Sequence, residues 1–423
     1  MLPSGKTADR YIGLDIHKHY LVAVGVDAEQ TLIFGPQRVA YTQLTRWSQQ
    51  HLTTTDAVVL EMTTNAFQIY DELQPLVQSV TLVHPPHVAL VTRVAVKTDT
   101  KAALALAQLH AAGLLTAVWV PPQAIRDLRA LVAQRRKMRR LATQARNRLH
   151  AALHRARLLP PAGNLFAAEQ RTWWAELPVS MLERVRIQSD LATLDFAEGQ
   201  VKQMEAALAA VAAEDERIPL LIQLPGIQLV SAITILAAIG EIGRFPSAQQ
   251  LVGYAGLGAS VHSSGQLHRT GRLTKEGRRD LRHIMVEAAQ TASRHHPHWR
   301  AELERLTPRL GRNKAIVAIA RKLLVTVWHV LSKGSVDRFA EPSDVARALM
   351  VYGYRLGRAQ RPDGQSVPQF VRAQLDRLGI GAELTTVAKG PSTILQLPPA
   401  SVRSRAIGER VDRQGPIAPS AAC

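Results

Sequence analysis

The sequence predicts a fold of class α/β plus α, in which a mixed-sheet domain precedes domains that are mostly helical. Three observations support this prediction. Short β-rich runs alternate with helical patterns between about residues 9 and 120, as in a sheet covered by helices. From residue 121 onward, apolar residues recur mostly at helical spacing. The chain has 423 residues, 46% of them hydrophobic, and it can therefore bury two or three ordinary domain cores.

The charge balance predicts a polyanionic partner. Lys and Arg total 52 against 34 acids, which gives a formal net charge of +18. Nucleic acid is the first interpretation, and a membrane surface is the rival. No apolar run of about 18 to 20 residues and no signal peptide is evident, so a cytoplasmic protein without a membrane partner is expected. The single cysteine, Cys423, excludes disulfides and cysteine zinc sites as structural devices.

The first predicted domain spans residues 9–120. Residues 11–17, 21–26 and 31–34 are β-rich runs separated by turn residues, and they predict an antiparallel meander. Residues 57–61, 66–76 and 80–83 predict strand, helix and strand, which is a βαβ unit. The Ala- and Leu-rich stretch 101–112, which lacks Gly and Pro, predicts a further helix.

Three acids occupy positions where such a fold gathers ligands. Asp15 and Glu61 end β-rich runs, and Asp99 directly precedes the helix predicted over 101–112. Ligands collect at the carboxyl ends of parallel strands, and carboxylate oxygens suit Mg²⁺ or Mn²⁺. We therefore predict that Asp15, Glu61 and Asp99 hold a divalent metal. Taken singly, Asp15 or Asp99 has an ordinary alternative as a turn or helix-cap residue.

Histidines also lie near these strand ends, namely His17, His84 and His87. An Asp-x-His sequence can indicate transition-metal ligation. Because no second close His pair lies on a helix face, packing or support of the acids is the favoured interpretation for these histidines.

The second predicted domain, residues 121–215, is a basic helical linker. Apolar residues recur at helical spacing from Ile125 to Leu153, and the positions between them are almost all basic. The alternative is a solvated surface helix, but such helices usually alternate charge sign, so we predict nucleic-acid contact. The predicted contacts are Arg135, Arg136, Arg139, Arg140, Arg146 and Arg148. Residues 181–213 show coiled-coil-like spacing, which predicts a spacer or an oligomerisation arm.

The third predicted domain, residues 216–334, carries a candidate nucleophile. Residues 224–227, Leu-Pro-Gly-Ile, precede an apolar helix, as in a helix-hairpin-helix turn that can hold a phosphate. Ser264 lies in a stretch predicted as a loop, 261–272, with Arg269, Arg272 and Lys275 close by. A serine among cations suits attack on phosphorus, whereas the alternative is a flexible polar loop. Residues 335–423 are predicted to be an accessory tail that is partly disordered.

Several motifs occur together and in order. They are Gly-Leu-Asp-Ile-His-Lys at 13–18, the run into Glu61, Lys-Thr-Asp at 97–99, Asn-Arg-Leu-His at 147–150, Leu-Pro-Gly-Ile at 224–227, Tyr-Ala-Gly-Leu at 254–257, and Ser-Ser-Gly at 263–265 leading through Arg-x-Gly to Val-Glu-Ala-Ala at 286–289. With these motifs the chain resembles the insertion-sequence transposases that combine a RuvC-like DEDD domain with a C-terminal serine domain. These enzymes are also described as bridge-RNA-guided recombinases and are related to Piv-type DNA invertases.

The resemblance implies a ribonuclease-H-like domain whose acids hold Mg²⁺ and a serine that forms a covalent link to DNA. By position, Ser264 matches the nucleophile, with Ser263 as the second candidate. The implied partners are donor and target DNA, a noncoding bridge RNA that pairs with both, and further copies of the chain in a dimer or tetramer. The protein would then be nucleoid-associated when bound to DNA.

One position departs from the family pattern. The family has a fourth acid three residues after the one that matches Asp99, and here that position is Ala102. Three interpretations follow from the sequence. The chain is a serine recombinase with an altered metal site, or a metal-dependent junction nuclease or site-specific invertase, or an inactive derivative that still binds nucleic acid.

Overall fold

The computed structural model describes residues 8–86, 98–264, 267–390 and 394–401. It divides into two compact units, residues 1–122 and 123–423. The first unit is an α/β domain and the second is mostly helical, so the predicted fold class is confirmed. The finer division of the second unit at residues 215 and 334 stays a prediction.

The first unit is built on a five-stranded mixed sheet with the order β3-β2-β1-β4-β5. β1 pairs antiparallel with β2 and parallel with β4, and β5 continues the parallel side. The strands are β1 (Arg10–Ile16), β2 (Tyr20–Val26), β3 (Leu32–Ala40), β4 (Asp56–Glu61) and β5 (Ser79–Val83), and the helices are α1 (Leu44–His51), α2 (Ala66–Leu73) and α4 (Asp99–Ala111). The meander and the βαβ unit are therefore where the sequence placed them.

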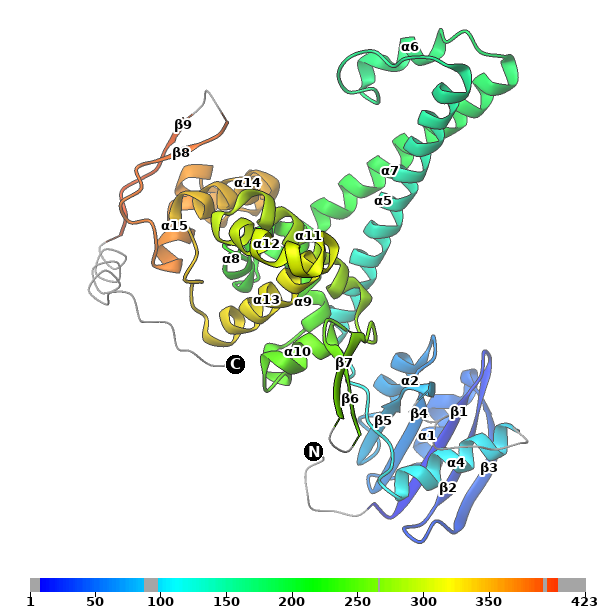
Figure 1. Cartoon of the computed structure of the whole chain (residues 1–423). Coiled ribbons are helices and arrows are strands. Elements are labelled where there is room, and N and C mark those ends of the chain that lie inside the picture. Colours follow the sequence, from blue (N-terminus) through cyan, green and yellow to red (C-terminus); the bar gives the residue numbers. More distant parts are fainter. Residues whose placement is uncertain (1–7, 87–97, 265–266, 391–393, 402–423) are drawn as a thin grey trace. The chain divides into compact units, whose positions relative to one another are not determined.

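The two faces of this sheet carry different residues because side chains alternate along each strand. Ile12, Leu14 and Leu60 face a core that includes Leu44 from α1 and Ile69 from α2. The intervening residues pack against α4: Val22 and Val24 contact Ala103, and Val59 contacts Leu106. Figure 1 shows α4 lying across the strands.

Gly13 sets how closely α4 approaches β1. A Cβ atom at this position would lie 2.0 Å from the carbonyl oxygen of Ala103 and 2.7 Å from the amide nitrogen of Ala107. Both atoms belong to the helix backbone, so a side chain at position 13 cannot be accommodated without moving α4. Glycine is therefore required here for backbone-to-backbone contact between strand and helix.

An ion pair joins the first residues of β1 and β4. Arg10 on β1 donates to both carboxylate oxygens of Asp56 on β4, at 2.8 and 2.7 Å. Asp56 is fully buried and also accepts a hydrogen bond from the amide of Thr53 at 2.7 Å. The hydrogen bond to Asp56 raises the pKa of Arg10. This bidentate pair fixes the register of β1 against β4, since the two residues are partners in the ladder.

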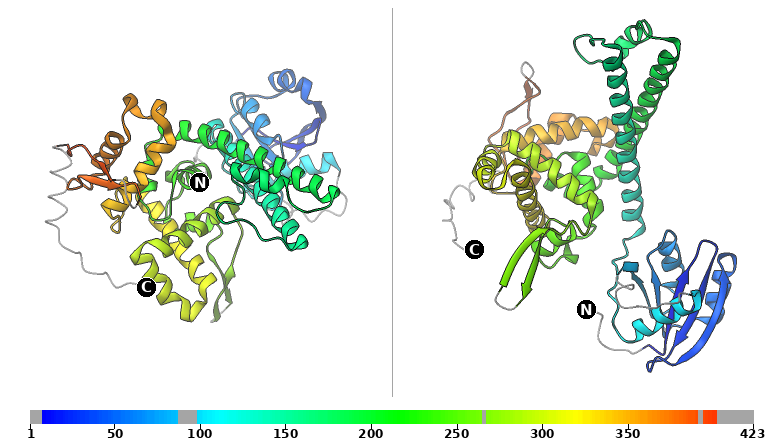
Figure 2. Two further views of the ribbon diagram at one scale, coloured as in Figure 1. Left: turned by 90° about the horizontal axis from the view of Figure 1, so that it is seen from above. Right: turned by 45° about the vertical axis from the view of Figure 1, so that its right-hand side comes forward.

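The second unit begins with two long helices, α5 (Gln123–Ala156) and α7 (Met181–Ala213). Figure 2 shows them side by side in both views. The short helix α6 (Arg171–Ala175) lies between them in the sequence. Their contact is apolar along α5 residues such as Ala142, Ala145 and Leu149, which are buried together with Leu194 and Ala197 of α7. The predicted basic helix and coiled-coil-like helix thus form one antiparallel pair.

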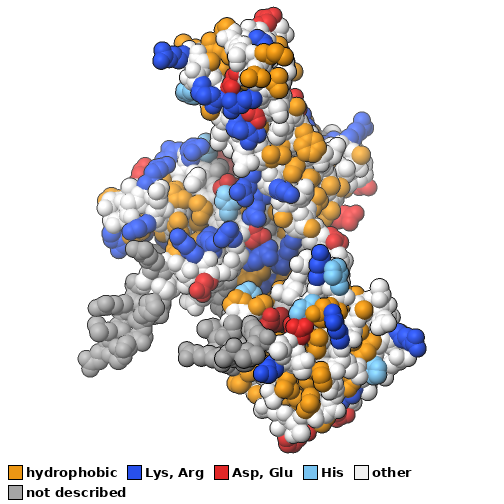
Figure 3. All heavy atoms as spheres, turned by 90° about the vertical axis from the view of Figure 1, so that its right-hand side faces the viewer, with side chains coloured by type: hydrophobic (Ala, Val, Ile, Leu, Met, Phe, Trp, Pro, Cys, Tyr) orange, Lys and Arg blue, Asp and Glu red, His pale blue; other side chains and the backbone are white. Residues whose placement is uncertain are grey.

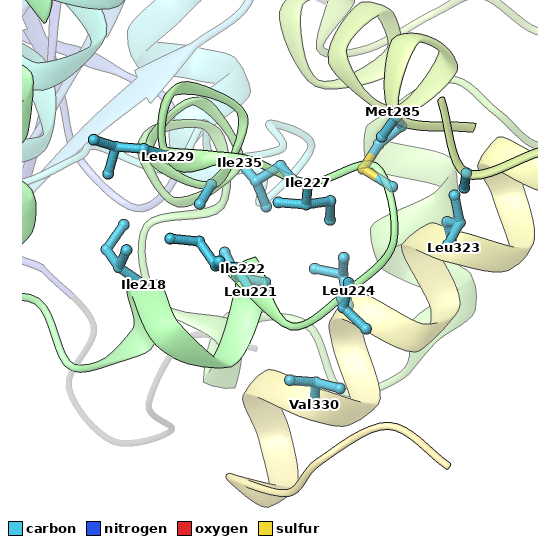
Figure 4. Packing of buried hydrophobic residues seen from close by; sticks show 14 of the residues in the cluster. Ile218, Leu221, Ile222, Leu224, Ile227, Leu229, Ile235, Met285, Leu323 and Val330 are labelled. Atoms are coloured by element: carbon cyan, nitrogen blue, oxygen red, sulfur yellow. The ribbon is translucent and has the colours of Figure 1, made fainter. Parts of the chain in front are cut away.

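The remaining helices of this unit share one large core. It joins α8 (Arg217–Ile222), α9 (Leu229–Ile239), α10 (Ala248–Tyr254), α11 (Arg279–His295), α12 (Pro297–Leu310), α13 (Arg312–Lys333), α14 (Pro342–Gln360) and α15 (Val367–Leu378). Figure 4 shows Leu224 and Ile227 of the turn between α8 and α9 in this core, together with Met285 of α11 and Leu323 of α13. Gly226 in that turn has φ +81°, and a Cβ there would lie 2.2 Å from the carbonyl oxygen of Ala288, so the turn requires glycine.

Two details of this unit differ from the sequence predictions. α13 has the length and apolar composition of a membrane-spanning helix, which the sequence analysis missed, but its residues Ile319, Leu323 and Val327 are buried in the core. The stretch from residue 335 to the end of α15 packs on the rest of the unit and is not a separate tail, because Leu349 of α14 and Phe370 of α15 belong to the same core. The disorder predicted for the tail concerns segments that lie largely outside the described residues.

The second half of that stretch is organised by a buried arginine. Arg372 of α15 is 4% exposed and donates to the carbonyl oxygens of Gly381 at 2.9 Å, Pro398 at 3.0 Å and Leu384. It also pairs with Asp376 at 3.4 Å. A single side chain thus satisfies the carbonyls on both sides of the small hairpin β8 (Thr386–Ala388) and β9 (Ile394–Gln396).

Candidate metal centre and nucleic-acid interface

Asp15, His17 and Asp99 form a cluster on the α4 face of the first sheet. One ligand atom from each residue lies within 4.8 Å of the other two. Asp15 follows Gly13 by two residues on β1 and therefore faces α4, and the close approach at Gly13 brings the start of α4 to it. Their side chains are partly exposed, by 22% for Asp15, 31% for His17 and 45% for Asp99.

The local structure argues against the turn and cap alternatives for these acids. Asp15 is a strand residue paired with Val22 of β2. The N-cap of α4 is Thr98, whose hydroxyl accepts a hydrogen bond from the amide of Lys101 at 3.3 Å, whereas Asp99 is the first residue of the helix. The carboxylate of Asp99 therefore lies in the cluster, and Thr98 caps the helix.

Glu61 ends β4 on the same face of the sheet as Val59. Since Leu14 and Leu60 are partners in the parallel ladder, Asp15 and Glu61 each lie one residue beyond the same pair. The carboxylate of Glu61 is not part of the three-residue cluster. The structure thus brings Asp15 and Asp99 together and leaves Glu61 on the neighbouring strand end.

His17 holds the position between the two acids. Its Nε2 lies 3.3 Å from Asp15 Oδ2 and 3.2 Å from Asp99 Oδ2, yet this buried atom makes no hydrogen bond of acceptable geometry to any described residue. The sequence alone favours a packing or supporting role for this histidine. The signal that could have found it is the strand period of two, which places Asp15 and His17 on one face. His84 is not part of the cluster, and His87 lies outside the described residues.

Two tyrosines fix the cluster. Tyr20 donates a hydrogen bond to Asp99 Oδ2 at 3.0 Å, which raises the pKa of Tyr20, and its ring stacks on His17 with a centroid distance of 4.6 Å. The guanidinium of Arg38 covers the Tyr20 ring at 3.8 Å. Tyr41 donates to the backbone carbonyl of His17 at 2.5 Å, and burial raises its pKa. Both phenols therefore remain protonated donors at neutral pH.

The donor set fits a divalent cation. Two carboxylates and an imidazole nitrogen converge within the span of one coordination sphere, and the nitrogen lacks a hydrogen-bonding partner. Substitution of either acid would leave the imidazole beside a single carboxylate. This arrangement can hold a metal against a phosphate, because all three side chains are partly exposed.

The six candidate arginines of α5 divide into two groups. Arg135, Arg146 and Arg148 form ion pairs with Glu205, Glu198 and Asp190 of α7, respectively. For these three, the inference that unbalanced charge requires nucleic acid does not hold, because α7 supplies the acids. Arg136, Arg139 and Arg140 are exposed and have no ion pair within the described ranges of the chain.

The second group of arginines lines a groove of about 510 Å³ between α5, α9 and α11. Thr143 and Gln144 of α5, Thr234 of α9 and His283 of α11 contribute further polar groups to it. Figure 3 shows Lys and Arg side chains gathered on the visible face of the helical unit. Two acids, Asp280 and Glu287, also line the groove, and they pair with Arg278 and His283, respectively. The exposed guanidinium groups beside neutral hydrogen-bonding side chains suit contact with a sugar-phosphate backbone.

Ser264 is the last residue of a strand and does not lie in a loop as predicted. β6 (Ala259–Ser264) and β7 (Leu267–Leu273) form an antiparallel hairpin in which Ser264 pairs with Leu267. The two intervening residues, Gly-Gln, are a dipeptide that hairpins use, and this signal outweighs the polar composition. Lys275 is exposed between β7 and α11. The side chains of Ser264, Arg269 and Arg272 lie outside the described parts of the structure.

A hydrogen bond closes the base of the hairpin, and α11 contacts the segment that precedes it. The amide of Thr274 donates to the carbonyl of Gly258 at 3.1 Å, and Arg282 donates to the carbonyl of Ala255 at 2.9 Å. Gly256 and Gly277 have φ of +66° and +109°, and a Cβ at either would collide with backbone at 2.3 Å. The Tyr-Ala-Gly-Leu motif thus functions as the close contact that orients the hairpin bearing Ser264.

Comparison with known proteins places both regions within recognised families. Residues 12–157 match the family described as DEDD_Tnp_IS110, Transposase, and residues 218–304 match the Transposase IS116/IS110/IS902 family. The first match contains the acid cluster and α5, and the second contains the hairpin with Ser264.

Individual relatives agree with these matches. The transposase for insertion sequence element IS1111A of Coxiella burnetii is 25% identical over 352 residues, covering 78% of this chain and 91% of that protein. The pilin gene-inverting protein of Moraxella bovis is 26% identical over 337 residues, covering 76% of this chain and 95% of that protein. The y4qE protein of Sinorhizobium fredii is 28% identical over 220 residues, and this match spans 51% of its length.

Proposed function

Because the chain belongs to the IS110 family of insertion-sequence transposases, which has a DEDD domain and a Transposase_20 domain, we propose that it cleaves and exchanges DNA strands through a covalent link to Ser264. The observation that carries the proposal is the meeting of Asp15 and Asp99 from distant parts of the sequence, inside the segment that matches the DEDD family. The order of the two matches along the chain supports it.

Each group has a defined role in this proposal. Asp15, Asp99 and Glu61 hold Mg²⁺ or Mn²⁺, which when bound supplies a Lewis acid that polarises the scissile phosphodiester. Tyr20 keeps the Asp99 carboxylate oriented. The Ser264 oxygen attacks phosphorus, the bond from phosphorus to the departing deoxyribose oxygen breaks, and the serine proton ends on that oxygen. Attack by a hydroxyl of the other strand then reverses the step, restores the serine and joins the new strands.

The proposed partners are donor and target DNA and a noncoding guide RNA. Arg136, Arg139 and Arg140 would contact phosphates in the groove of α5, and Arg269, Arg272 and Lys275 would hold the phosphate near Ser264. Such contacts give affinity with little base information, so sequence would be read by pairing with the RNA.

We further propose that the chain acts as a homo-oligomer, a dimer or tetramer, in which acids and serine of different protomers meet. Three apolar residues of α7 support this: Leu182, Val185 and Phe196 are 77%, 55% and 58% exposed and recur at coiled-coil spacing. Replacing Phe196 by Glu is expected to reduce the mass of the particle in light scattering, with Phe196→Leu as the control that keeps it.

The test of the covalent step compares Ser264→Ala with Ser263→Ala on labelled DNA that carries the element junction. The proposal predicts that Ser264→Ala abolishes the protein–DNA adduct and strand exchange, whereas Ser263→Ala retains both. A metal-dependent junction nuclease would keep cutting after Ser264→Ala. An inactive derivative would yield no adduct in the unaltered chain, and Ala102→Asp would then be the variant that restores it.

A further inference from the structure

The imidazole of His17 occupies the centre of the acid cluster in a fixed orientation. Its backbone carbonyl accepts from Tyr41 at 2.5 Å, its amide donates to the carbonyl of Tyr20 at 2.9 Å, and its ring stacks on the Tyr20 ring at 26°. Two of these contacts fix the backbone of His17 just after β1, and the stacking on Tyr20 holds its ring. Such support is typical of a side chain whose direction matters, because a surface histidine would otherwise rotate freely.

The nitrogen that faces the acids has no other partner. Nε2 is buried, lies 3.2 to 3.3 Å from one oxygen of each carboxylate, and makes no hydrogen bond of acceptable geometry within the described residues. A buried polar atom without a partner is costly. A cation seated between the three groups would give the nitrogen a partner and would also contact both carboxylates.

The helix α4 offers no second acid for this purpose. The residue one turn after Asp99 is Ala102, so a methyl group follows on the same side of the helix. Of the ligand atoms gathered in the cluster, two are oxygens and one is nitrogen. A site with this composition differs from the all-oxygen sites that Mg²⁺ prefers.

We propose that His17 Nε2 is a direct metal ligand and that it gives the site a preference for Mn²⁺ over Mg²⁺. This inference rests on the proposed function, in which Asp15 and Asp99 hold a divalent cation. Imidazole nitrogen binds first-row transition metals well and Mg²⁺ poorly, whereas carboxylate oxygens accept both. His17 therefore decides which metal the acids hold.

The competing account is that His17 is a protonated counterion that bridges the two carboxylates. In that case the imidazole would leave or turn away when a metal binds, and no nitrogen would enter the coordination sphere. Removing the side chain would then leave Mn²⁺ binding unchanged or stronger, since a competing positive charge would be gone.

Pulsed electron paramagnetic resonance of the Mn²⁺-loaded full-length protein distinguishes the two accounts. The proposal predicts ¹⁴N modulation from a bound imidazole, which changes to the ¹⁵N pattern when histidine is supplied as the ¹⁵N isotope. The labelled protein needs no substitution, so folding defects cannot produce the result. His17→Ala is expected to remove the signal, whereas His19→Ala, at an exposed neighbouring position, is expected to keep it.

Calorimetric titration gives the second readout. Loss of an outer contact of a metal site already costs about 10- to 100-fold in affinity, so His17→Ala is expected to weaken Mn²⁺ binding by at least about tenfold. His17→Asp is expected to shift the preference back toward Mg²⁺. Mn²⁺ binding without nitrogen modulation would overturn the inference and leave the metal centre standing. Unchanged Mn²⁺ binding by Asp15→Asn would instead refute the metal centre of the proposed function.

Discussion

Gly13→Ala tests whether backbone contact between β1 and α4 builds the acid cluster. The added methyl group would lie 2.0 Å from the carbonyl oxygen of Ala103, and a separation below 3.0 Å is not tolerated. Strand and helix therefore have to separate by about 1 Å, and overpacking of this kind costs about 1–3 kcal/mol. Because Asp99 begins the same helix, its carboxylate moves away from Asp15 with it.

Two measurements follow the effect of Gly13→Ala. Hydrogen exchange of the amides in α4 is expected to accelerate by about 5- to 150-fold, which corresponds to the cost of about 1–3 kcal/mol. Mn²⁺ affinity is expected to fall in parallel. Gly199→Ala is the matched control, because a Cβ at this position of α7 has nothing within 4 Å, and alanine stabilises a helix. Native exchange rates and native Mn²⁺ affinity in Gly13→Ala would refute the reasoning.

Three further predictions concern the helical unit. In salt titrations of nucleic-acid binding, Arg136→Gln is expected to reduce the slope of log affinity against log salt concentration by about 0.7 to 0.9, the value of one phosphate contact. Arg135→Gln is expected to leave this slope nearly unchanged. Equal effects of the two substitutions would contradict the division of the arginines into two groups. The hydrogen bond from Arg305 lowers the pKa of Glu302 to about 2, so this carboxylate contributes stability that is complete above pH 4.5 and is lost as pH falls toward 2. In urea unfolding, Glu302→Gln is therefore expected to cost about 1 kcal/mol at pH 7 and less at pH 3. In the same assay, Arg372→Met is expected to lower the free energy of unfolding by at least about 1–3 kcal/mol, because three carbonyls lose their donor. Native stability of this variant would show that water replaces the guanidinium.

Most of the sheet of the first unit could be predicted from local pattern, because β1, β2, β4 and β5 are runs of β-formers. The prediction covered only the start of β3, because Gly35 and Pro36 interrupt that strand. The same pattern placed Asp15 and Glu61 at neighbouring strand ends. The pattern could not predict how closely Asp99 at the start of α4 approaches Asp15 on β1. The contact at Gly13 brings Asp99 to Asp15, and a glycine in a strand has no unique meaning in sequence.

His17 shows a different limit of sequence reasoning. A lone histidine beside an acid is usually a packing residue, and the decisive facts are its contacts with Tyr41 and Tyr20. The β1–β2 turn brings the Tyr20 ring onto His17, whereas Tyr41 reaches the His17 carbonyl from 24 residues further along the chain. Ser264 shows the same limit, because its polar surroundings favoured a loop although the Gly-Gln dipeptide after it favours a hairpin.

The arginines of α5 show why charge alone predicts an interface incompletely. Within α5 the basic residues have almost no acids nearby in sequence, and the partners of Arg135, Arg146 and Arg148 lie 42 to 70 residues away on α7. An antiparallel helix pair brings such residues together at every turn. The sequence therefore overestimates the free positive charge of α5 on the side that meets α7.

The same pairing gives a reason why the remaining charge is concentrated. α7 neutralises one side of α5 and so leaves Arg136, Arg139 and Arg140 exposed along the groove with α9 and α11. These helices belong to the compact unit whose core also supports the turn beneath the Ser264 hairpin. A phosphate backbone bound in the groove would thus be held by the same rigid unit as the proposed nucleophile. Binding energy from phosphates far from the proposed reaction can then orient the strand that Ser264 is proposed to attack. In this way contacts without base information would still contribute to the rate.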